Sequence, residues 1–376
     1  YLRYRVRTTA YLTEKLHAIG VPVMRPAGGH AVFVDARKWL PHIPPLAYPG
    51  QAAAVALYET GGIRSCEIGT VMFGAKPVFV DVEPEHYCID PAKIEARITP
   101  RTRAIVPVHI AGQPCDMDPI LEIARRHDLR VIEDSAETMF VRYKGRPVGS
   151  MSDIGCFSTY VAHVINTGVG GLCVTSSPEL ITILKSLMNH GRDSIYTRID
   201  DAAGKEGQAL FEIADRRFSF VRFGFSYRCT EMEAALGIAQ LETRESDWRR
   251  RCAIAERFND GLAPLAEHLL LPGIRAGAEH AWMFYPLVLR GDEGRRPALI
   301  QHLENNHVET RYLLPLLNQP VYQQHFGDLE PEYPVARKLN RDAFYIGCHA
   351  AMTDTEVAFV IEVIHDFFRG RDAARR

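Results

Sequence analysis

Apolar and polar positions alternate along the chain in a way that predicts strands joined by helices. Near-continuous apolar runs at Ala104–Ile110, Leu129–Ile132 and Ile154–Thr159 predict strands that are buried on both faces of a parallel sheet. Between the first two runs, helical spacing predicts a helix over Pro119–His127. This order is typical of a right-handed, doubly wound sheet, so the pattern predicts the α/β class.

The same patterns extend in both directions from this core. Asp90 followed by Pro91 is typical of a helix start, because Asp caps free N–H groups and Pro suits the first helical position. Before and after it the pattern predicts strands at Pro77–Val82, Leu172–Thr175 and Met283–Leu289, and helices at Asp90–Ile98, Pro178–His190, Glu231–Arg250, Arg296–Asn305 and Thr355–Phe368.

Two polar side chains follow neighbouring predicted strands. Asp134 ends the run that begins at Leu129, and His163 follows the run that ends at Thr159. Ligands of open α/β sheets bind at the carboxyl ends of the strands. Asp134 and His163 are therefore the first candidate functional residues.

Composition excludes several classes of protein. The chain has 376 residues, a formal net charge of -2 and 47% hydrophobic residues, which indicates a globular protein and gives no electrostatic basis for binding nucleic acid. None of the eight cysteines forms a CxxC pair, so we expect free thiols and a cytoplasmic location. The sequence predicts neither a signal peptide nor a membrane span.

The first 73 residues resemble one particular family. The segments GGHAVFVDARKWLPHIPP and YPGQAAAVALYETGGIRSCEIGTVMFG are similar to the small C-terminal domain of the tryptophanase/tyrosine phenol-lyase family. The pattern there predicts helices over residues 1–20 and 51–60 and strands at 21–24 and 31–34. By this resemblance Arg64 would bind a substrate carboxylate; a solvated surface arginine is the alternative.

From Gly74 onward the chain resembles the DegT/DnrJ/StrS family of sugar-nucleotide aminotransferases, which use pyridoxal phosphate (PLP). The resemblance rests on the segments VIEDSAETMFVRYKGRPVGSMSDIGCFSTY, GFSYRCTEMEAALGIAQLE and ETRYLLPLLNQPVY. It implies a fold type I PLP transferase with a large domain over 74–250 and a smaller α/β domain over 251–376. We expect the first part of the large domain, with its phosphate-binding helix N-terminus, to be missing and cofactor affinity to be poor unless residues 1–73 or a partner chain fill the gap.

The resemblance also implies cofactor-binding roles. Asp134 matches the carboxylate that keeps the pyridine nitrogen protonated, with a helix N-cap as the alternative. Glu137 stands where the family often has Gln near the ring hydroxyl, and a surface glutamate is its alternative. Ser158 matches a phosphate-binding serine, and glycines 168, 170 and 171 match a turn beside the ring.

Further residues match positions that contact the phosphate or the substrate. Ser226 stands in place of an asparagine that reaches the partner subunit's phosphate, and Arg228 is the matching arginine. His190, Arg192 and Arg311 are candidates for substrate binding. Surface, ion-paired or helix-end roles are the alternatives for these cations.

His163 is the decisive departure from the family pattern. It stands where the family has the lysine that holds the cofactor covalently, and imidazole cannot supply a primary amine. One branch of the family, similar to the pyridoxamine phosphate (PMP)-dependent 3-dehydratases, carries histidine there and binds the cofactor without a tether. Histidine suits proton transfer near neutrality. Lys144 and Lys185 lie off the motif and are interpreted as surface residues.

The sequence therefore predicts a PLP- or PMP-dependent enzyme that acts on a nucleotide-linked keto-sugar, with a dehydratase-like reaction and a homodimeric assembly. The alternatives are an aminotransferase homologue with lost or altered activity, a non-catalytic paralogue, and a tryptophanase-type fragment. Three further residues have a core role as the favoured interpretation: His109, Trp282 and Tyr285.

Overall fold

The computed structural model describes residues 75–193, 202–216, 219–291, 294–313 and 317–375, together with residues 10, 14, 17 and 18. The chain divides into two compact units, Tyr1–Phe79 and Val80–Arg376. Residues 10, 14, 17 and 18 of the first unit are helical, which agrees with the helix predicted over 1–20. The other elements predicted before residue 74, and Arg64, lie outside the described residues.

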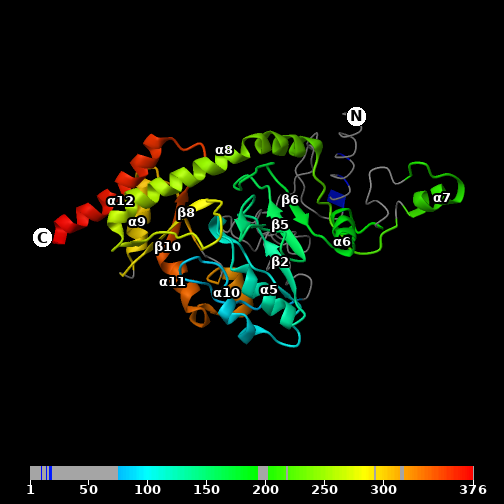
Figure 1. The fold of residues 1–376 in the computed structure, drawn as a ribbon, viewed down its shortest axis with the longest axis horizontal. Helices are drawn as coiled ribbons and strands as arrows, with labels where there is room; N and C mark the ends of the chain where they lie inside the picture. Colours follow the sequence, from blue (N-terminus) through cyan, green and yellow to red (C-terminus); the bar gives the residue numbers. More distant parts are fainter. Residues whose placement is uncertain are drawn as a thin grey trace. The chain divides into compact units, whose positions relative to one another are not determined.

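A mostly parallel sheet forms the first half of the second unit (Figure 1). In the described part of the chain its strands are, in order, β1 (Ala104–Ile105), β2 (Arg130–Asp134), β5 (Ile154–Ser158) and β6 (Gly171–Val174). The first three run parallel, and β6 is antiparallel to β5. The predicted α/β class is confirmed.

Helix α5 (Met117–Arg126) connects β1 to β2 and shows why the sequence folds this way. Its buried residues are Met117, Ile120, Ile123 and Ala124, which recur at helical spacing and so share one face. That face packs into an apolar core with Ile105 and Val131 of the strands. The helix predicted over Pro119–His127 is confirmed with slightly different ends.

Three predictions before β2 are wrong in detail. Described residues of Pro77–Val82 form no ladder, and Val82 only forms an isolated antiparallel bridge with Ile89. The segment after Asp90 forms two short 3₁₀ turns, η2 (Pro91–Lys93) and η3 (Glu95–Arg97), although the Asp90 side chain accepts the predicted capping bond from Ala92 N. The run Ala104–Ile110 is a strand only at β1, because Pro107 has no N–H to continue the ladder.

An antiparallel sheet organises the C-terminal half. Among the described residues its strands are, in order, β7 (Leu269–Leu270), β8 (Phe284–Leu289), β10 (Ala343–Gly347) and β9 (Thr310–Tyr312). Three helices contribute to the core beside it: α8 (Glu231–Leu262), α9 (Arg295–Asn305) and α12 (Asp354–Arg375). Helix α8 continues past its predicted end at Arg250, and the domain boundary predicted there falls within this helix and stays a prediction.

The remaining elements are short or lie at the periphery. They are η4 (Ile110–Gly112), β3 (Arg142–Tyr143), β4 (Arg146–Pro147), α6 (Pro178–Met188), α7 (Gly207–Arg216), η6 (Ala263–Leu265), α10 (Pro320–Phe326), η7 (Glu330–Glu332) and α11 (Pro334–Asp342). In the described ranges, no helix combines the length and the apolar composition that a membrane crossing requires.

Phe258 tests the packing of the C-terminal core. It is fully buried on α8, and its ring centroid lies 4.9 Å from that of Tyr285. We expect Phe258→Ala to lower the free energy of unfolding by about 3–5 kcal/mol in urea titrations, because it removes a buried ring and leaves a cavity. Phe359→Ala is the control, since Phe359 is 47% exposed on α12; equal losses in both variants would contradict this packing.

Candidate cofactor site

Two candidate residues lie at the ends of adjacent parallel strands. Asp134 ends β2 and is in register with Cys156 of β5, and Ser158 ends β5 two residues further on. His163 lies just beyond β5, in a turn where its N–H donates to Tyr160 O at 2.9 Å. The structure thus brings these three residues to the same edge of the sheet.

His163 has the properties of a proton acceptor. Burial lowers the pKa of its imidazole, and the nearby Asp134 carboxylate opposes this in part, so the ring is neutral at pH 7. Its Nδ1 atom is buried and has no hydrogen-bond partner among the described residues. A buried polar atom normally has a partner, so this nitrogen is suited to a ligand.

Asp134 has a local contact and a longer-range electrostatic one. Its Oδ1 accepts a hydrogen bond from Ala136 N at 3.1 Å. The residues that follow it form turns and no helix, so the alternative interpretation as a helix N-cap is wrong. Its carboxylate acts on the pKa of both His163 and Glu137, which indicates that the three groups are close together.

Glu137 is partly buried, and the alternative of a surface helix glutamate is wrong. Its Oε2 accepts a hydrogen bond from Ala111 N at 2.6 Å. Burial raises the pKa of this carboxyl to about 7, with the Ala111 bond lowering it and Asp134 raising it further. Ala111 has a φ of 61°, a left-handed conformation that is unusual for a residue with a Cβ atom. Nothing in the sequence around Glu137 indicates this partner.

Two hydroxyl groups close to Asp134 were missed by the sequence analysis. Ser135 and Thr138 are fully buried, and their side-chain oxygens have no hydrogen-bond partner within the described ranges. The unpartnered nitrogen of His163 is another buried polar atom of this kind, and such atoms are suited to bonding a polar ligand. The only sequence signal was the spacing of two hydroxyl residues within four positions of Asp134.

Ser158 and the glycines that follow it shape the turn between β5 and β6. The Ser158 hydroxyl accepts a hydrogen bond from Tyr160 N at 3.2 Å. Gly170 has a φ of 123°, and a Cβ atom on Gly171 would lie 2.6 Å from Phe157 O. Both positions therefore need glycine. Residues 168 and 169 form a bend, and both the turn beside the cofactor ring and the phosphate role of Ser158 stay predictions.

A second cluster contains three of the other candidates. Nη2 of Arg228 lies 3.3 Å from the Ser226 hydroxyl and 3.4 Å from Nε2 of His190. The backbone N–H of His190 donates to Phe225 O, and Ser226 bridges Asn189. Ser226 and Arg228 are exposed, which leaves this polar cluster open to a ligand or a partner.

Arg192 and Arg311 make other side-chain contacts. Arg192 bridges Phe220, and its guanidinium lies 5.9 Å from the ring centroid of that residue. Arg311 is on β9 opposite Tyr345 of β10 and pairs with the adjacent Glu309. Burial raises the pKa of Tyr345, Glu137 raises it further and Arg311 lowers it, which indicates that both charged groups are near Tyr345.

The core interpretations of three residues are confirmed. His109 is fully buried and hydrogen-bonds Glu133 at 3.2 Å. Trp282 and Tyr285 are buried as well, and the Tyr285 hydroxyl donates to Asn259 Oδ1 at 2.7 Å. Lys144 is an exposed residue paired with Asp118, as predicted.

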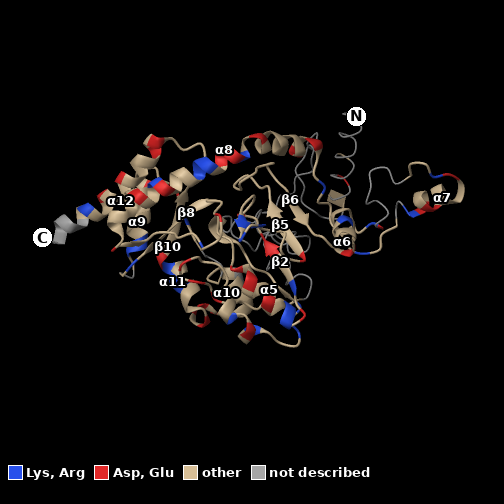
Figure 2. Cartoon of the chain, in the orientation of Figure 1, with Lys and Arg blue, Asp and Glu red and all other residues tan. Residues whose placement is uncertain are grey.

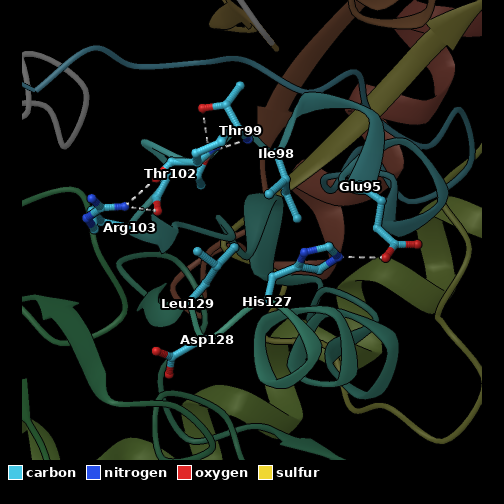
Figure 3. Close-up of a pocket in the computed structure, with 9 residues that line it drawn as sticks. Glu95, Ile98, Thr99, Thr102, Arg103, His127, Asp128 and Leu129 are labelled. Atoms are coloured by element: carbon cyan, nitrogen blue, oxygen red, sulfur yellow. Dashed lines mark hydrogen bonds and ion pairs between the residues drawn. The ribbon is translucent and has the colours of Figure 1, made fainter.

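A cavity of about 550 Å³ lies elsewhere in this unit (Figure 3). Leu129, which immediately precedes β2, lines it together with Arg103 and His127. Asp134 is at the opposite end of β2, so this cavity is not part of the candidate site. Ligands of open α/β sheets bind at the carboxyl ends of the strands, which also favours the Asp134 edge.

Comparison with known proteins identifies the family. The sequence model of the DegT/DnrJ/EryC1/StrS aminotransferase family matches residues 69–365. The chain belongs to this family. A curated relative, the GDP-perosamine synthase of Caulobacter vibrioides, is 34% identical over 293 residues, which cover 77% of this chain and 73% of that protein.

Solved structures support the same assignment. The Escherichia coli GDP-4-keto-6-deoxy-D-mannose-3-dehydratase, solved with bound hydrated PLP, has 26% identity and a TM-score of 0.66, with coverage of 76% of this chain and 73% of that chain. These proteins have the fold type I architecture, which is therefore the fold of this family member. A tryptophanase of Hyphomonas neptunium matches separately, at 77% identity over 77 residues, covering 20% of this chain and 17% of that protein.

Glu137 gives a pH-dependent prediction. Because its folded-state pKa is about 7 against an ordinary 4.5, the folded protein retains a proton that the unfolded chain loses, and stability falls as the pH rises between these values. Glutamine keeps an acceptor for Ala111 N without the charge. Denaturant titrations at each pH give the change in the free energy of unfolding that Glu137→Gln causes. We expect this change to be about 1–3 kcal/mol more stabilising at pH 8 than at pH 5.

The control is Glu122→Gln, since Glu122 is an exposed residue of α5. A Glu137→Gln effect that is equal at pH 5 and pH 8 would mean that this carboxyl titrates normally.

Proposed function

We propose that the protein binds its cofactor without a covalent tether at the edge formed by Asp134, Ser158 and His163, and dehydrates a nucleotide-linked 4-keto-6-deoxy-sugar at C3. The cofactor of this family member is PLP or PMP. The observation that carries the proposal is a buried imidazole nitrogen that has no partner among the described residues, at the motif position where the family has its lysine.

The described residues fit such a cofactor. When bound, the pyridoxal group supplies an electron sink for charge that develops on the substrate carbon. The Asp134 carboxylate would keep the pyridine nitrogen of the cofactor protonated. Its place at the end of β2, near His163, puts this carboxylate at the proposed site. Ser158 would donate its hydroxyl to the phosphate, and the buried hydroxyls of Ser135 and Thr138 would donate to the remaining acceptors.

His163 would carry out the proton transfer. Its lowered pKa keeps the imidazole neutral near pH 7, so an unprotonated ring nitrogen can accept a proton and then donate it to the departing hydroxyl. Glu137, with a pKa of about 7, is half protonated at that pH and can donate a hydrogen bond close to Asp134. Arg228 and His190 are the candidate contacts of the anionic part of the substrate or of the cofactor phosphate.

An aminotransferase reaction is the second candidate function. It is favoured by the relatives, which include both a perosamine synthase and an aminotransferase from Psychrobacter cryohalolentis that is 28% identical, with a TM-score of 0.70 over 80% of this chain and 77% of that chain. This reaction requires a lysine in the site. The two functions are therefore distinguished by whether any lysine binds the cofactor covalently.

The first test replaces His163. We expect His163→Gln to lower the rate of water loss from the keto-sugar by about 10²–10⁴-fold in the presence of PMP, because general acid–base catalysis contributes that much. Spectroscopic titration should show that PMP still binds to His163→Gln with an affinity close to that of the unmodified chain, since the cofactor contacts remain.

Borohydride trapping is the matched experiment. The unmodified chain should give no covalent PLP adduct after reduction, whereas His163→Lys should give one at the new lysine. A trapped adduct in the unmodified chain would contradict untethered binding and favour the aminotransferase. If neither PLP nor PMP binds, the protein is a non-catalytic paralogue.

We also propose a homodimer in the cytoplasm, with the Ser226–Arg228 cluster at the subunit interface. Support comes from the exposed apolar residues on and before the first half of α8. Figure 2 shows uncharged residues over much of this half and charged residues at the middle of the helix. The exposed large apolar residues of this stretch are Phe220, Val221, Phe223, Tyr227, Met232, Leu236, Ile238 and Leu241. So many exposed apolar side chains favour a protein interface here.

Charged substitutions at exposed apolar positions of α8 test the dimer prediction. Met232 is 78% exposed and Ile238 62% exposed. We expect the double variant Met232→Asp, Ile238→Asp to be a monomer in sedimentation velocity at concentrations where the unmodified chain is a dimer, because each aspartate would be desolvated in the interface. Phe359→Asp on α12 is the control and should remain dimeric; a monomeric unmodified chain would overturn the proposal.

A further inference from the structure

Two cysteines lie directly opposite each other where β6 joins the sheet. Cys156 on β5 is the register partner of Cys173 on the antiparallel strand β6. The bond from Thr159 N to Gly170 O identifies a hydrogen-bonded pair in this ladder. Because hydrogen-bonded and non-hydrogen-bonded pairs alternate, Cys156 and Cys173 form a non-hydrogen-bonded pair, in which opposing side chains approach most closely.

The spacing of such a pair matches that of a disulfide. Opposing Cα atoms in a non-hydrogen-bonded pair are about 4.5 Å apart. The Cα atoms of natural disulfides are usually about 4.4–6.8 Å apart. The backbone of β5 and β6 therefore needs little change to bring the sulfurs of Cys156 and Cys173 into bonding distance.

The chemical state of the pair also favours reaction. Both residues are thiols rather than halves of a disulfide, with Cys173 exposed and Cys156 partly exposed. A hydrogen bond from the Cys156 thiol lowers the pKa of Cys173 to about 7, against the opposing effect of burial. A large fraction of Cys173 is therefore the nucleophilic thiolate at neutral pH. By contrast, Cys88 and Cys115 are both buried, and burial raises the pKa of Cys115.

We propose that Cys156 and Cys173 form a redox-active dithiol that reacts with low-molecular-weight disulfides of the glutathione class and closes to a cross-strand disulfide. The Cys173 thiolate attacks one sulfur of the small disulfide, whose S–S bond breaks and releases one thiolate. Cys156 then loses its proton to solvent and attacks the Cys173 sulfur, which releases the second thiolate. Two cysteine sulfurs are oxidised, and the two sulfurs of the small disulfide are reduced.

This bond would fix a segment that matters for the site. Cys156 and Cys173 flank the turn region that carries Ser158 and His163, so the bond would close residues 156–173 into a loop and restrict its unfolded conformations. It would also fasten β6, which pairs only with β5 among the described residues and whose four residues are all exposed. The dithiol is independent of the cofactor reaction, and it can be tested without cofactor.

The test is exchange with oxidised glutathione at neutral pH, using the full purified chain. We expect intact mass spectrometry to show the loss of two hydrogens, and peptide mapping to recover one linked peptide pair that contains Cys156 and Cys173. A glutathione adduct that persists on Cys173, a bond to any other cysteine, or no product at all would overturn the proposal.

Cys156→Ala separates the pair from a single reactive thiol. This variant should accumulate a stable glutathione adduct on Cys173, because no resolving thiol remains. Its Cys173 should also react with iodoacetamide at pH 7 about fivefold more slowly, since the loss of thiolate outweighs the higher nucleophilicity at a higher pKa. Cys252→Ala is the matched control, because Cys252 is a partly buried thiol on α8, and it should leave both measurements unchanged.

Discussion

The buried carboxylate of Glu133 holds together the segments on which the rest of the first sheet depends. It is fully inaccessible to solvent, yet burial, which by itself would raise its pKa, is outweighed by its hydrogen bonds, so the pKa is lowered and the group is ionised. Such a charge is tolerated only when it is fully paired. Its donors are Nε2 of His109, the N–H groups of Gly149 and Met151, and the hydroxyl of Ser152. The Cys115 N–H donates to Nδ1 of His109, which places the imidazole proton on Nε2, facing Glu133.

This arrangement gives two consecutive acids different roles. Side chains alternate across a strand, so Glu133 and Asp134 at the end of β2 point to opposite faces. Glu133 binds the segment before β5 on one side, and Asp134 lies with His163 and Glu137 on the other. The fixed position of the first acid therefore sets the position of the second. Cofactor sites need such support behind the residues that contact the ligand.

Sequence patterns predicted the strand ends well and the long-range partners poorly. Asp134 and His163 could be placed together because parallel strands end at one edge of a sheet, and apolar runs identify such strands. Pro107 ends the strand β1, but the apolar residues on both sides of it favoured one continuous strand in the prediction from sequence. Glu137 bonds to Ala111, 26 positions earlier, and no local pattern encodes a contact of that range. The pairing of Arg228 with His190, across 38 positions, has the same origin.

Helix α8 has a consequence for how this protein can vary. Its first turn is held by the capping box of Thr230 and Glu233, next to Arg228, and its last turns are buried in the core through Phe258 and Leu262. At 32 residues it is about 48 Å long, so a tilt of about five degrees at one end displaces the other by about 4 Å. A small tilt of the helix is therefore a large displacement at its far end. A change of side-chain volume at Phe258 or Leu262 can thus move the Arg228 guanidinium, so residues at the two ends of α8 are expected to vary together.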